Sequence, residues 1–373
     1  MKKRILSLAL GATLLLGLLA GCNNSTADET QSGNSADPSK PKFCFVVTSQ
    51  LGDKSFNDSA AAGMNLITEQ LGCETKILEI GSDQTKWEPT LMDLSDTGEY
   101  DAIIVNGSGT IEIIEQLAEE FPDQKYVMFD TTIDEGAYPN VYAISYKQNE
   151  GSYLGGVLAG LVTISDMPNA NADKKIGFIG GEEDPIISDF LVGYIEGAQS
   201  VDPDIKVYVS YVGSWTDTAK GKELALAQYN QGVDIIFPAA MTSGLGCIEA
   251  AVEQGKYIIG VDSDQAMLFK GTDEDKANVI LTSVMKEVGQ SLYRFAEMEL
   301  EGTVPWGSSE TLGIQEGASD IAVNEYYEKN VPQEIRDKVD EARQSVLDGK
   351  VTVTSALGLP TEELNAILDS CKP

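Results

Sequence analysis

The chain has 373 residues, with 26 basic and 59 acidic side chains, a formal net charge of −33 at pH 7 and no histidine. So large a negative charge repels nucleic acid and anionic lipid, and neither is expected as a partner. Because histidine is absent, the sequence also excludes Ser-His-Asp triads, histidine metal sites and imidazole acid–base catalysis.

The N-terminus has the pattern of an export signal. A basic start, "MKKR", precedes an apolar run over residues 5–20 that is too short to span a membrane stably. The sequence "LAGC" resembles a bacterial lipobox, which implies cleavage before Cys22, lipidation of its thiol and export of the downstream chain. An ordinary signal peptide with an incidental cysteine is the alternative. We expect residues 1–21 to be a lipoprotein signal peptide and Cys22 to anchor the protein at the extracytoplasmic face of the cell membrane.

Residues 22–41 are polar, poor in apolar side chains and interrupted by Pro38 and Pro41. Such a segment cannot bury enough apolar surface to fold, so we expect a disordered tether. The roughly 330 residues that follow are enough for two domains. No later run is apolar for long enough to cross a bilayer, so we expect membrane contact only through the lipid.

The first half of the folded region alternates apolar runs with helical segments. The expected strands are 43–48, 74–80, 101–107, 125–130 and 140–146, and the expected helices are 57–71, 86–96 and 111–121. Near-continuous Val, Ile and Phe runs separated by helices of this length predict parallel strands buried on both faces.

The pattern then restarts with a second set of elements. A helix is expected over 150–162, and strands over 174–181, 205–213, 233–240 and 256–262. The remainder contains a helix over 286–300, a short strand near 311–317 and charged C-terminal helices, too little for a third domain of the same kind. Two such sets predict an α/β protein with two doubly wound parallel-sheet lobes and a cleft between them. We expect lobe 1 to comprise 42–145 plus about 285–310, and lobe 2 to comprise 146–284 plus about 311–373 with the C-terminal helices.

Four cysteines remain downstream of the anchor: Cys44, Cys73, Cys247 and Cys371. Their wide spacing excludes a CxxC metal or redox motif. A disulfide between Cys44 and Cys73 is sterically possible because both lie in or just before neighbouring expected strands. Buried free thiols are the alternative, and we favour it.

Polar and aromatic residues gather where the expected strands end, which is where ligands meet a doubly wound sheet. The main candidates are Asp53, Phe56, Asn57, Asp130, Trp215, Asp262 and Lys286. Asn57 could instead cap the following helix, and Lys286 could be a solvated helix residue. Asp130 and Asp262 each close an apolar strand, where a carboxylate is costly unless it is paired or wet.

The aromatic residues are the most informative of these candidates. Phe56 belongs to a loop of the first lobe and Trp215 to a loop of the second, and both are flanked by polar residues. Rings on opposite sides of a cleft can stack on a flat ligand, and nearby carboxylates can accept hydrogen bonds from sugar hydroxyls or ring N–H groups. A planar base with an attached polyol would fit. The alternative is that each ring packs into its own lobe.

Seven segments in order carry a family resemblance between about residues 43 and 320. They are "GDKSFNDSA", "YLGGVLAGL", "IGFIGGEEDPIISDFLVGYIEGAQ", "YVGSWTDTAKGKELA", "YNQGVDIIFPAA", "IGVDSDQ" and "LTSVMK". Together they resemble the basic-membrane-protein family of lipoproteins, which are similar to purine-nucleoside receptors. The resemblance implies a type I periplasmic-binding-protein fold and the substrate-binding role in an ABC importer.

The resemblance also implies roles for the candidate residues. Phe56 and Trp215 would sandwich the purine ring, with Trp215 standing where the family usually has phenylalanine, and Asn57 would be a polar contact beside Phe56. Asp262 would hold the edge of the base, and Asp130 and Lys286 would lie nearer the ribose.

Two departures from the family pattern bear on specificity. Many members carry an aspartate before "DKSFN" that contacts the nucleoside, whereas the shorter loop here offers Ser49 and Gln50. Where the family often reads "AAGGTG", this chain reads "AAMTSG", so Met241 is expected to narrow the pocket.

The expected function is therefore binding without chemistry, by a monomer with no cofactor or metal. A nucleoside, with purines preferred, would be captured by closure about hinges near 144–149, 281–285 and 311–315 and delivered to an ABC permease. One alternative is a receptor for another small polar ligand, such as a sugar or signalling molecule. The other is a nucleoside hydrolase that uses Asp130 and Asp262 as paired carboxylates.

Overall fold

The computed structural model describes residues 39–107 and 109–373. The predicted signal peptide, the lipidation site Cys22 and most of the predicted tether lie outside the described residues. Within the described ranges, no helix has both the length and the apolar character needed to cross a membrane.

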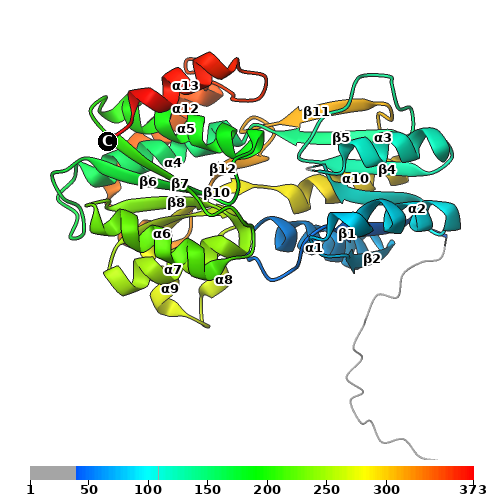
Figure 1. Cartoon of the computed structure of the whole chain (residues 1–373), viewed down its shortest axis with the longest axis horizontal. Coiled ribbons are helices and arrows are strands. Elements are labelled where there is room, and N and C mark those ends of the chain that lie inside the picture. Colours follow the sequence, from blue (N-terminus) through cyan, green and yellow to red (C-terminus); the bar gives the residue numbers. More distant parts are fainter. Residues whose placement is uncertain (1–38, 108) are drawn as a thin grey trace, which may run out of the picture. The chain divides into compact units, whose positions relative to one another are not determined.

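The described chain forms two six-stranded sheets, each with helices on its faces (Figure 1). Sheet 1 contains β1 (Lys42–Val47), β2 (Glu74–Glu79), β3 (Ala102–Asn106), β4 (Lys125–Phe129), β5 (Val141–Tyr146) and β11 (Ser308–Leu312). Sheet 2 contains β6 (Lys175–Gly180), β7 (Lys206–Tyr211), β8 (Ile235–Ala239), β9 (Tyr257–Asp262), β10 (Ile280–Lys286) and β12 (Ser319–Ile321).

The two sheets have the same strand order. Sheet 1 runs β2-β1-β3-β4-β5-β11 with every pair parallel, and sheet 2 runs β7-β6-β8-β9-β10-β12 with only β12 antiparallel. The direction of winding reverses between β1 and β3 in sheet 1 and between β6 and β8 in sheet 2. These are the switch points at which doubly wound sheets open a crevice for ligands.

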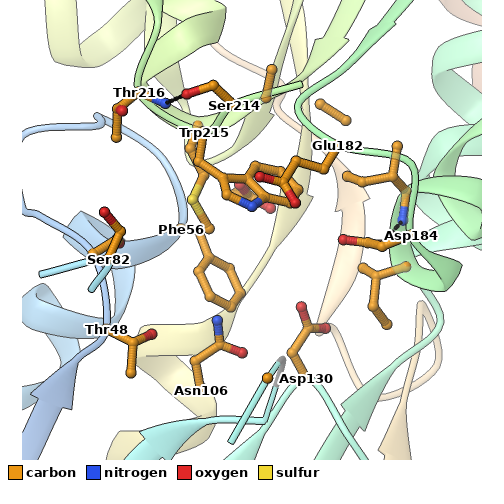
Figure 2. Close-up of a pocket in the computed structure, with 18 of the residues that line it drawn as sticks. Thr48, Phe56, Ser82, Asn106, Asp130, Glu182, Asp184, Ser214, Trp215 and Thr216 are labelled. Atoms are coloured by element: carbon orange, nitrogen blue, oxygen red, sulfur yellow. Dashed lines mark hydrogen bonds between the residues drawn. The ribbon is translucent and has the colours of Figure 1, made fainter. Parts of the chain in front are cut away.

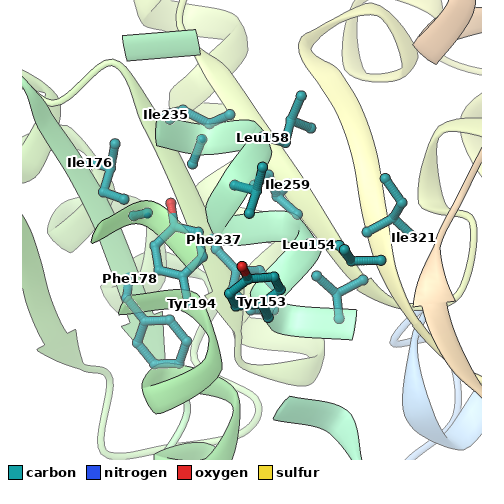
Figure 3. Packing of buried hydrophobic residues seen from close by; sticks show 14 of the residues in the cluster. Tyr153, Leu154, Leu158, Ile176, Phe178, Tyr194, Ile235, Phe237, Ile259 and Ile321 are labelled. Atoms are coloured by element: carbon teal, nitrogen blue, oxygen red, sulfur yellow. The ribbon is translucent and has the colours of Figure 1, made fainter. Parts of the chain in front are cut away.

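Helices bury both faces of each sheet. On sheet 1, α1 (Phe56–Leu66) and α10 (Val288–Glu301) cover one face, and α2 (Trp87–Thr97) and α3 (Ile111–Glu120) cover the other. On sheet 2, α4 (Gln148–Thr163), α5 (Pro185–Val201) and α12 (Gln333–Leu347) cover one face. Figure 3 shows Tyr153, Leu154 and Leu158 of α4 and Tyr194 of α5 packed with residues of the sheet. The opposite face carries α6 (Thr218–Asn230), α7 (Met241–Gln254), α8 (Gln265–Phe269), α9 (Glu274–Val279) and α11 (Glu325–Asn330). The C-terminal helix α13 (Thr361–Ser370) packs against α5.

The described chain passes between the sheets at three places. They are the junction of β5 and α4 at Lys147, the junction of β10 and α10 at Glu287, and residues 313–318 between β11 and β12. β10 ends at Lys286 and β11 at Leu312, within a few residues of the predicted lobe limits.

The predicted strands and helices are present with ends displaced by a residue or two, except near the second and third connections between the sheets. The helix predicted over 286–300 is α10, which begins at Val288, because Lys286 is the last residue of β10, a strand that was not predicted. The apolar run of β10 is interrupted by Thr282 and Ser283, which weakens its pattern. Both hydroxyls form hydrogen bonds to residues distant in sequence: Thr282 donates to the carbonyl of Ala322, and Ser283 accepts from the backbone N–H of Gln265.

The single strand predicted near 311–317 is present only as β11, which ends at Leu312. A second short strand, β12, follows and belongs to the other sheet. Cys44, Cys73, Cys247 and Cys371 are buried free thiols, as favoured over a disulfide.

Lobe 2 is packed through backbone contact between α4 and α5. A Cβ atom at Gly197 would overlap the carbonyl oxygen of Tyr153, and one at Gly156 would overlap that of Tyr194. Glycine is therefore required at both positions for the two helices to approach so closely. The contact buries the "YLGGVLAGL" segment of α4, in which Gly156 and Gly160 face α5 and Gly155 faces β9 and β10 of the sheet.

We expect Gly197→Ala to lower the free energy of unfolding by about 1–3 kcal/mol, because the added methyl group must push α4 and α5 apart. Chemical denaturation followed by circular dichroism measures this change. Gly244→Ala is the matched control, since its Cβ would meet Pro238 at an ordinary 3.7 Å. That substitution should be neutral or slightly stabilising. Equal destabilisation by both variants would contradict the backbone-contact explanation.

Candidate functional site

A cavity of about 310 Å³ lies at the carboxyl ends of the strands of both sheets. Its walls include residues that follow β1, β3 and β4 of sheet 1 and β6, β7 and β8 of sheet 2, together with the last residues of β9 and β10. The volume is within the range of small-molecule sites, roughly 300–1,000 Å³. The cavity therefore spans the switch points of both sheets and belongs to both lobes.

Phe56 and Trp215 line this cavity from different lobes. Figure 2 shows both rings pointing into it, with Asn106 and Asp130 beside Phe56 and Glu182 beside Trp215. Phe56 is the first residue of α1 and rests on Phe129, with ring centroids 5.3 Å apart. One face of the Phe56 ring is thus held by the core of lobe 1.

The Trp215 ring is half-buried and packs on the core of lobe 2. It lies directly over Gly181, where any Cβ atom would overlap the indole. Gly181 follows β6, so the switch point of sheet 2 provides the flat surface that supports the ring. Phe56 and Trp215, the two aromatic residues predicted for the site, therefore both line the cavity. Each ring also packs against the core of its own lobe.

Lys286 ends β10 and is only 1% exposed. Its ammonium forms an ion pair with Asp130, which follows β4 of the other sheet. The Lys286 nitrogen also lies 5.3 Å from the ring centroids of Phe56, Tyr146 and Phe190, which suits a cation enclosed by aromatic faces. The pair brings two predicted site residues together across the lobes.

Asp262 is the last residue of β9 and is 6% exposed. Its carboxylate accepts a hydrogen bond from the Ser55 hydroxyl of lobe 1. Burial raises the pKa of Asp262 to about 7, although the Lys286 ammonium and the Ser55 hydroxyl both lower it. Asp262 therefore changes charge near neutral pH in the unliganded protein.

Of the predicted site residues in the loop after β1 and at the start of α1, Phe56 and Ser49 line the cavity, and Gln50, Asp53 and Asn57 do not. Ser49 lines the cavity, and its hydroxyl accepts from the Asn57 amide, which also donates to the carbonyl of Gln50. Asp53 is fully buried and accepts the backbone N–H groups of Ser55 and Asn57. The structure thus places Gln50, Asp53 and Asn57 behind the wall, where they hold the loop in shape.

Several lining residues were not singled out from the sequence: Thr48, Trp87, Asn106, Glu182, Asp184, Phe190 and Ser214. Asn106 is the last residue of β3. The search for polar residues at the ends of expected strands, which selected Asp130 and Asp262, could therefore have found it. Trp87 begins α2, is 7% exposed and donates its indole N–H to the carbonyl of Gly81. Asp184 caps α5 through the Ile187 amide, and burial raises its pKa.

The chemistry of the lining combines aromatic faces with hydrogen-bond acceptors. Four carboxylates line the cavity, those of Asp130, Glu182, Asp184 and Asp262, against one ammonium, that of Lys286. Within residues 39–107 and 109–373, no group of three or more acidic or cysteine side chains is arranged to hold a metal ion. The arrangement is suited to a flat, uncharged ligand with several hydrogen-bond donors.

Comparisons with known proteins agree with this architecture. Residues 40–353 match the family described as "ABC transporter substrate-binding protein PnrA-like". The chain is 32% identical to the ABC transporter nucleoside-binding protein BmpA of Lactococcus lactis subsp. cremoris, over 95% of this chain and 100% of that protein. It is 32% identical to Basic membrane protein A2 of Borrelia garinii subsp. bavariensis, over 84% and 88% of the two chains.

A solved ABC transporter solute-binding protein from Aeropyrum pernix K1 superposes with a TM-score of 0.77 at 24% identity, covering 89% of this chain and 99% of that one. A second, from Conexibacter woesei, has a TM-score of 0.66 at 20% identity and covers 85% and 99% of the two chains. These likenesses confirm the predicted periplasmic-binding-protein fold with two doubly wound lobes. The chain belongs to the family of PnrA-like ABC transporter substrate-binding proteins.

Proposed function

We propose that this substrate-binding protein captures nucleosides, with purines preferred, in the cavity between its lobes. The observation that carries the proposal is the pair of rings, Phe56 and Trp215, that enter one cavity from different lobes. A planar base that enters between them gains dispersion and stacking contact on both faces. The relative from Lactococcus lactis is named a nucleoside-binding protein, which supports this ligand class.

The polar residues of the cavity supply partners for the rest of a nucleoside. Asp262 is a hydrogen-bond acceptor for ring N–H or amino groups at the edge of the base. Asp130 and Lys286 form a charged pair whose remaining lone pairs and protons are suited to the vicinal hydroxyls of a ribose. Asn106 and Ser49 add uncharged donors and acceptors at the strand ends of sheet 1. Binding by these groups requires no covalent step.

Closure of the lobes is the proposed mechanical step. The chain crosses between the sheets at Lys147, Glu287 and residues 313–318, and rotation about these connections changes the width of the cavity. A ligand that contacts both Phe56 and Trp215 stabilises the closed form because the open form offers only one ring at a time. The closed, loaded protein would deliver its ligand to the permease of an ABC importer. Cys22 would carry the lipid that keeps it at the extracytoplasmic face of the membrane.

Isothermal titration calorimetry against purine nucleosides, pyrimidine nucleosides and simple sugars tests the ligand class. We expect binding of purine nucleosides, weaker binding of pyrimidine nucleosides because their rings are smaller, and none of free sugars. Binding of a sugar with no response to any nucleoside would contradict the proposal. Release of free base with turnover from inosine or guanosine would instead favour a nucleoside hydrolase.

Removal of either ring should weaken nucleoside binding. We expect Phe56→Ala and Trp215→Ala each to cost about 1–3 kcal/mol of binding free energy, the scale of stacking between a base and an aromatic side chain. Calorimetry with the preferred nucleoside gives the change directly. Trp215→Phe should retain most of the affinity because it keeps an aromatic face over Gly181.

Trp306→Phe is the matched control for these variants. Trp306 packs against Phe295 and Tyr142 in the core of lobe 1 and does not line the cavity. Its substitution should leave affinity unchanged. If Phe56→Ala and Trp215→Ala also leave affinity unchanged, both rings have only a packing role and the sandwich is wrong.

The raised pKa of Asp262 predicts that affinity depends on pH. Its carboxyl is protonated in the free protein below about pH 7, and only the carboxylate can accept two hydrogen bonds from a base. Binding therefore releases a proton at low pH, and affinity should rise with pH by up to about tenfold per unit until it levels off near 7. Calorimetry in buffers of different ionisation enthalpy at about pH 6 and about pH 8 counts the protons released.

Asp262→Asn is the control for the pH dependence. The amide cannot titrate, so this variant should bind more weakly above pH 7 and show a flat profile below it. The other charged groups that act on Asp262 are Lys286, Asp53 and Asp130. If Asp262→Asn keeps the slope of the parent protein, another group is responsible and the assignment to Asp262 is wrong.

A further inference from the structure

Met241 has a strained backbone at the wall of the cavity. Among the described residues, the non-glycine residues with positive φ are Lys54, Asp130, Lys174, Met241 and Asp262, and three of these line the cavity. Aspartate tolerates this conformation because its short polar side chain can bond locally, but methionine has no such compensation. Met241 adopts φ +46° at the start of α7. Strain of this kind persists where the surrounding structure requires it, and it clusters at binding sites.

The strand order places Met241 between Asp262 and Trp215. Along sheet 2, β9 ends at Asp262, its neighbour β8 leads into Met241, and the next strand, β6, leads into Gly181 under the Trp215 ring. Neighbouring strands are about 4.8 Å apart, so Met241 lies beside any group that reaches both Asp262 and Trp215. In a bound nucleoside that group is the base.

The Met241 side chain reaches across to lobe 1. It packs against the core cluster of lobe 1 that contains Phe56, although its backbone belongs to lobe 2. Its sulfur lies 4.0 Å from the side-chain nitrogen of Asn57, which is fixed in turn by Ser49 and Gln50. Met241 thus reaches from lobe 2 to lobe 1 at the wall of the cavity that Phe56 and Trp215 also line.

We propose that Met241 is a specificity-determining residue that limits the size of the base the cavity accepts. This inference rests on the proposed nucleoside function. The unbranched thioether contacts the edge of an unsubstituted purine, and it occupies the volume that a bulky substituent on that edge would need. The parent protein therefore selects against purine nucleosides with large groups on the base, while modification of the sugar is unaffected by Met241.

Calorimetry on the parent protein, Met241→Gly and Met241→Leu tests this role. The ligands are adenosine, guanosine and inosine, derivatives of them with a benzyl or phenyl group at position 2, 6 or 8 of the base, and a 5′-O-alkyl derivative. We expect the parent protein and Met241→Leu to bind at least one base-substituted derivative about tenfold or more weakly than its unsubstituted parent nucleoside. Met241→Gly should reduce that ratio about tenfold, through tighter binding of the derivative, and leave the 5′-O-alkyl ratio unchanged.

Two controls accompany these measurements, one for loss of folding and one for the removal of a methionine outside the cavity. Glycine adopts φ +46° without strain, so Met241→Gly should not unfold at a lower temperature than Met241→Ala. Met267→Ala removes a half-exposed methionine of α8 that does not line this cavity, and it should change no ratio.

The possible failures can be told apart. If the parent protein binds no purine nucleoside, the proposed function itself is wrong. If the parent binds purine nucleosides but Met241→Gly preserves every ratio between substituted and unsubstituted bases, the role of Met241 is overturned while nucleoside binding stands. An equal loss of affinity for all ligands in Met241→Gly would also overturn it, because such a loss indicates a role in lobe closure and not in selection.

Discussion

The buried ammonium of Lys286 is the constraint on which the cavity depends. A lysine that is 1% exposed is strongly destabilising unless an opposite charge compensates it, and Asp130 supplies that charge from the other sheet. Because Lys286 is the last residue of β10, directly before the chain crosses between the sheets, the pair joins this connection to the strand ends of sheet 1. The aromatic faces of Phe56, Tyr146 and Phe190 enclose the same nitrogen. One charge thus organises rings from both lobes around a single point.

The ammonium of Lys286 also affects the carboxylates that line the cavity. Asp130 is paired, and Asp262 is stabilised as an anion by Lys286 and by the Ser55 hydroxyl, yet burial still raises its pKa to about 7. One ammonium cannot compensate the four carboxylates of the lining, so a ligand that brings a further negative charge would be repelled. Neutral ligands with donors avoid that cost. The overall charge of −33 acts in the same direction at longer range.

The sequence was sufficient to locate most of the fold, because buried parallel strands have a strong and regular apolar pattern. It failed at β10, where Thr282 and Ser283 interrupt the pattern and contribute hydrogen bonds that only the tertiary structure provides. For the cavity, the positions at the ends of predicted strands led to Asp130 and Asp262, whereas the role of Lys286 came from the family resemblance, because β10 was not predicted. The sequence did not predict that the side chains of Asp53 and Asn57 form hydrogen bonds within the loop and do not line the cavity. Asp53 accepts the backbone N–H of Asn57, and the Asn57 amide donates to the Ser49 hydroxyl. Trp87 was missed because it begins a helix and follows no strand directly.

Each lobe contains a pair of helices that touch at backbone distance, which limits movement within the lobe. In lobe 2, α4 and α5 touch through glycines at backbone distance, and in lobe 1 the same kind of contact joins α1 to α10 at Gly63 and Gly289. Helices packed in this way cannot slide without a clash, so each lobe moves as a unit. In the proposed mechanism, a ligand held between Phe56 and Trp215 would therefore act on the three connections between the sheets and on side chains such as Met241 that span the lobes. Under that proposal, selectivity would depend on how far the lobes can close on a given base, so it would be determined by residues at the edge of the cavity and not by the core of either lobe.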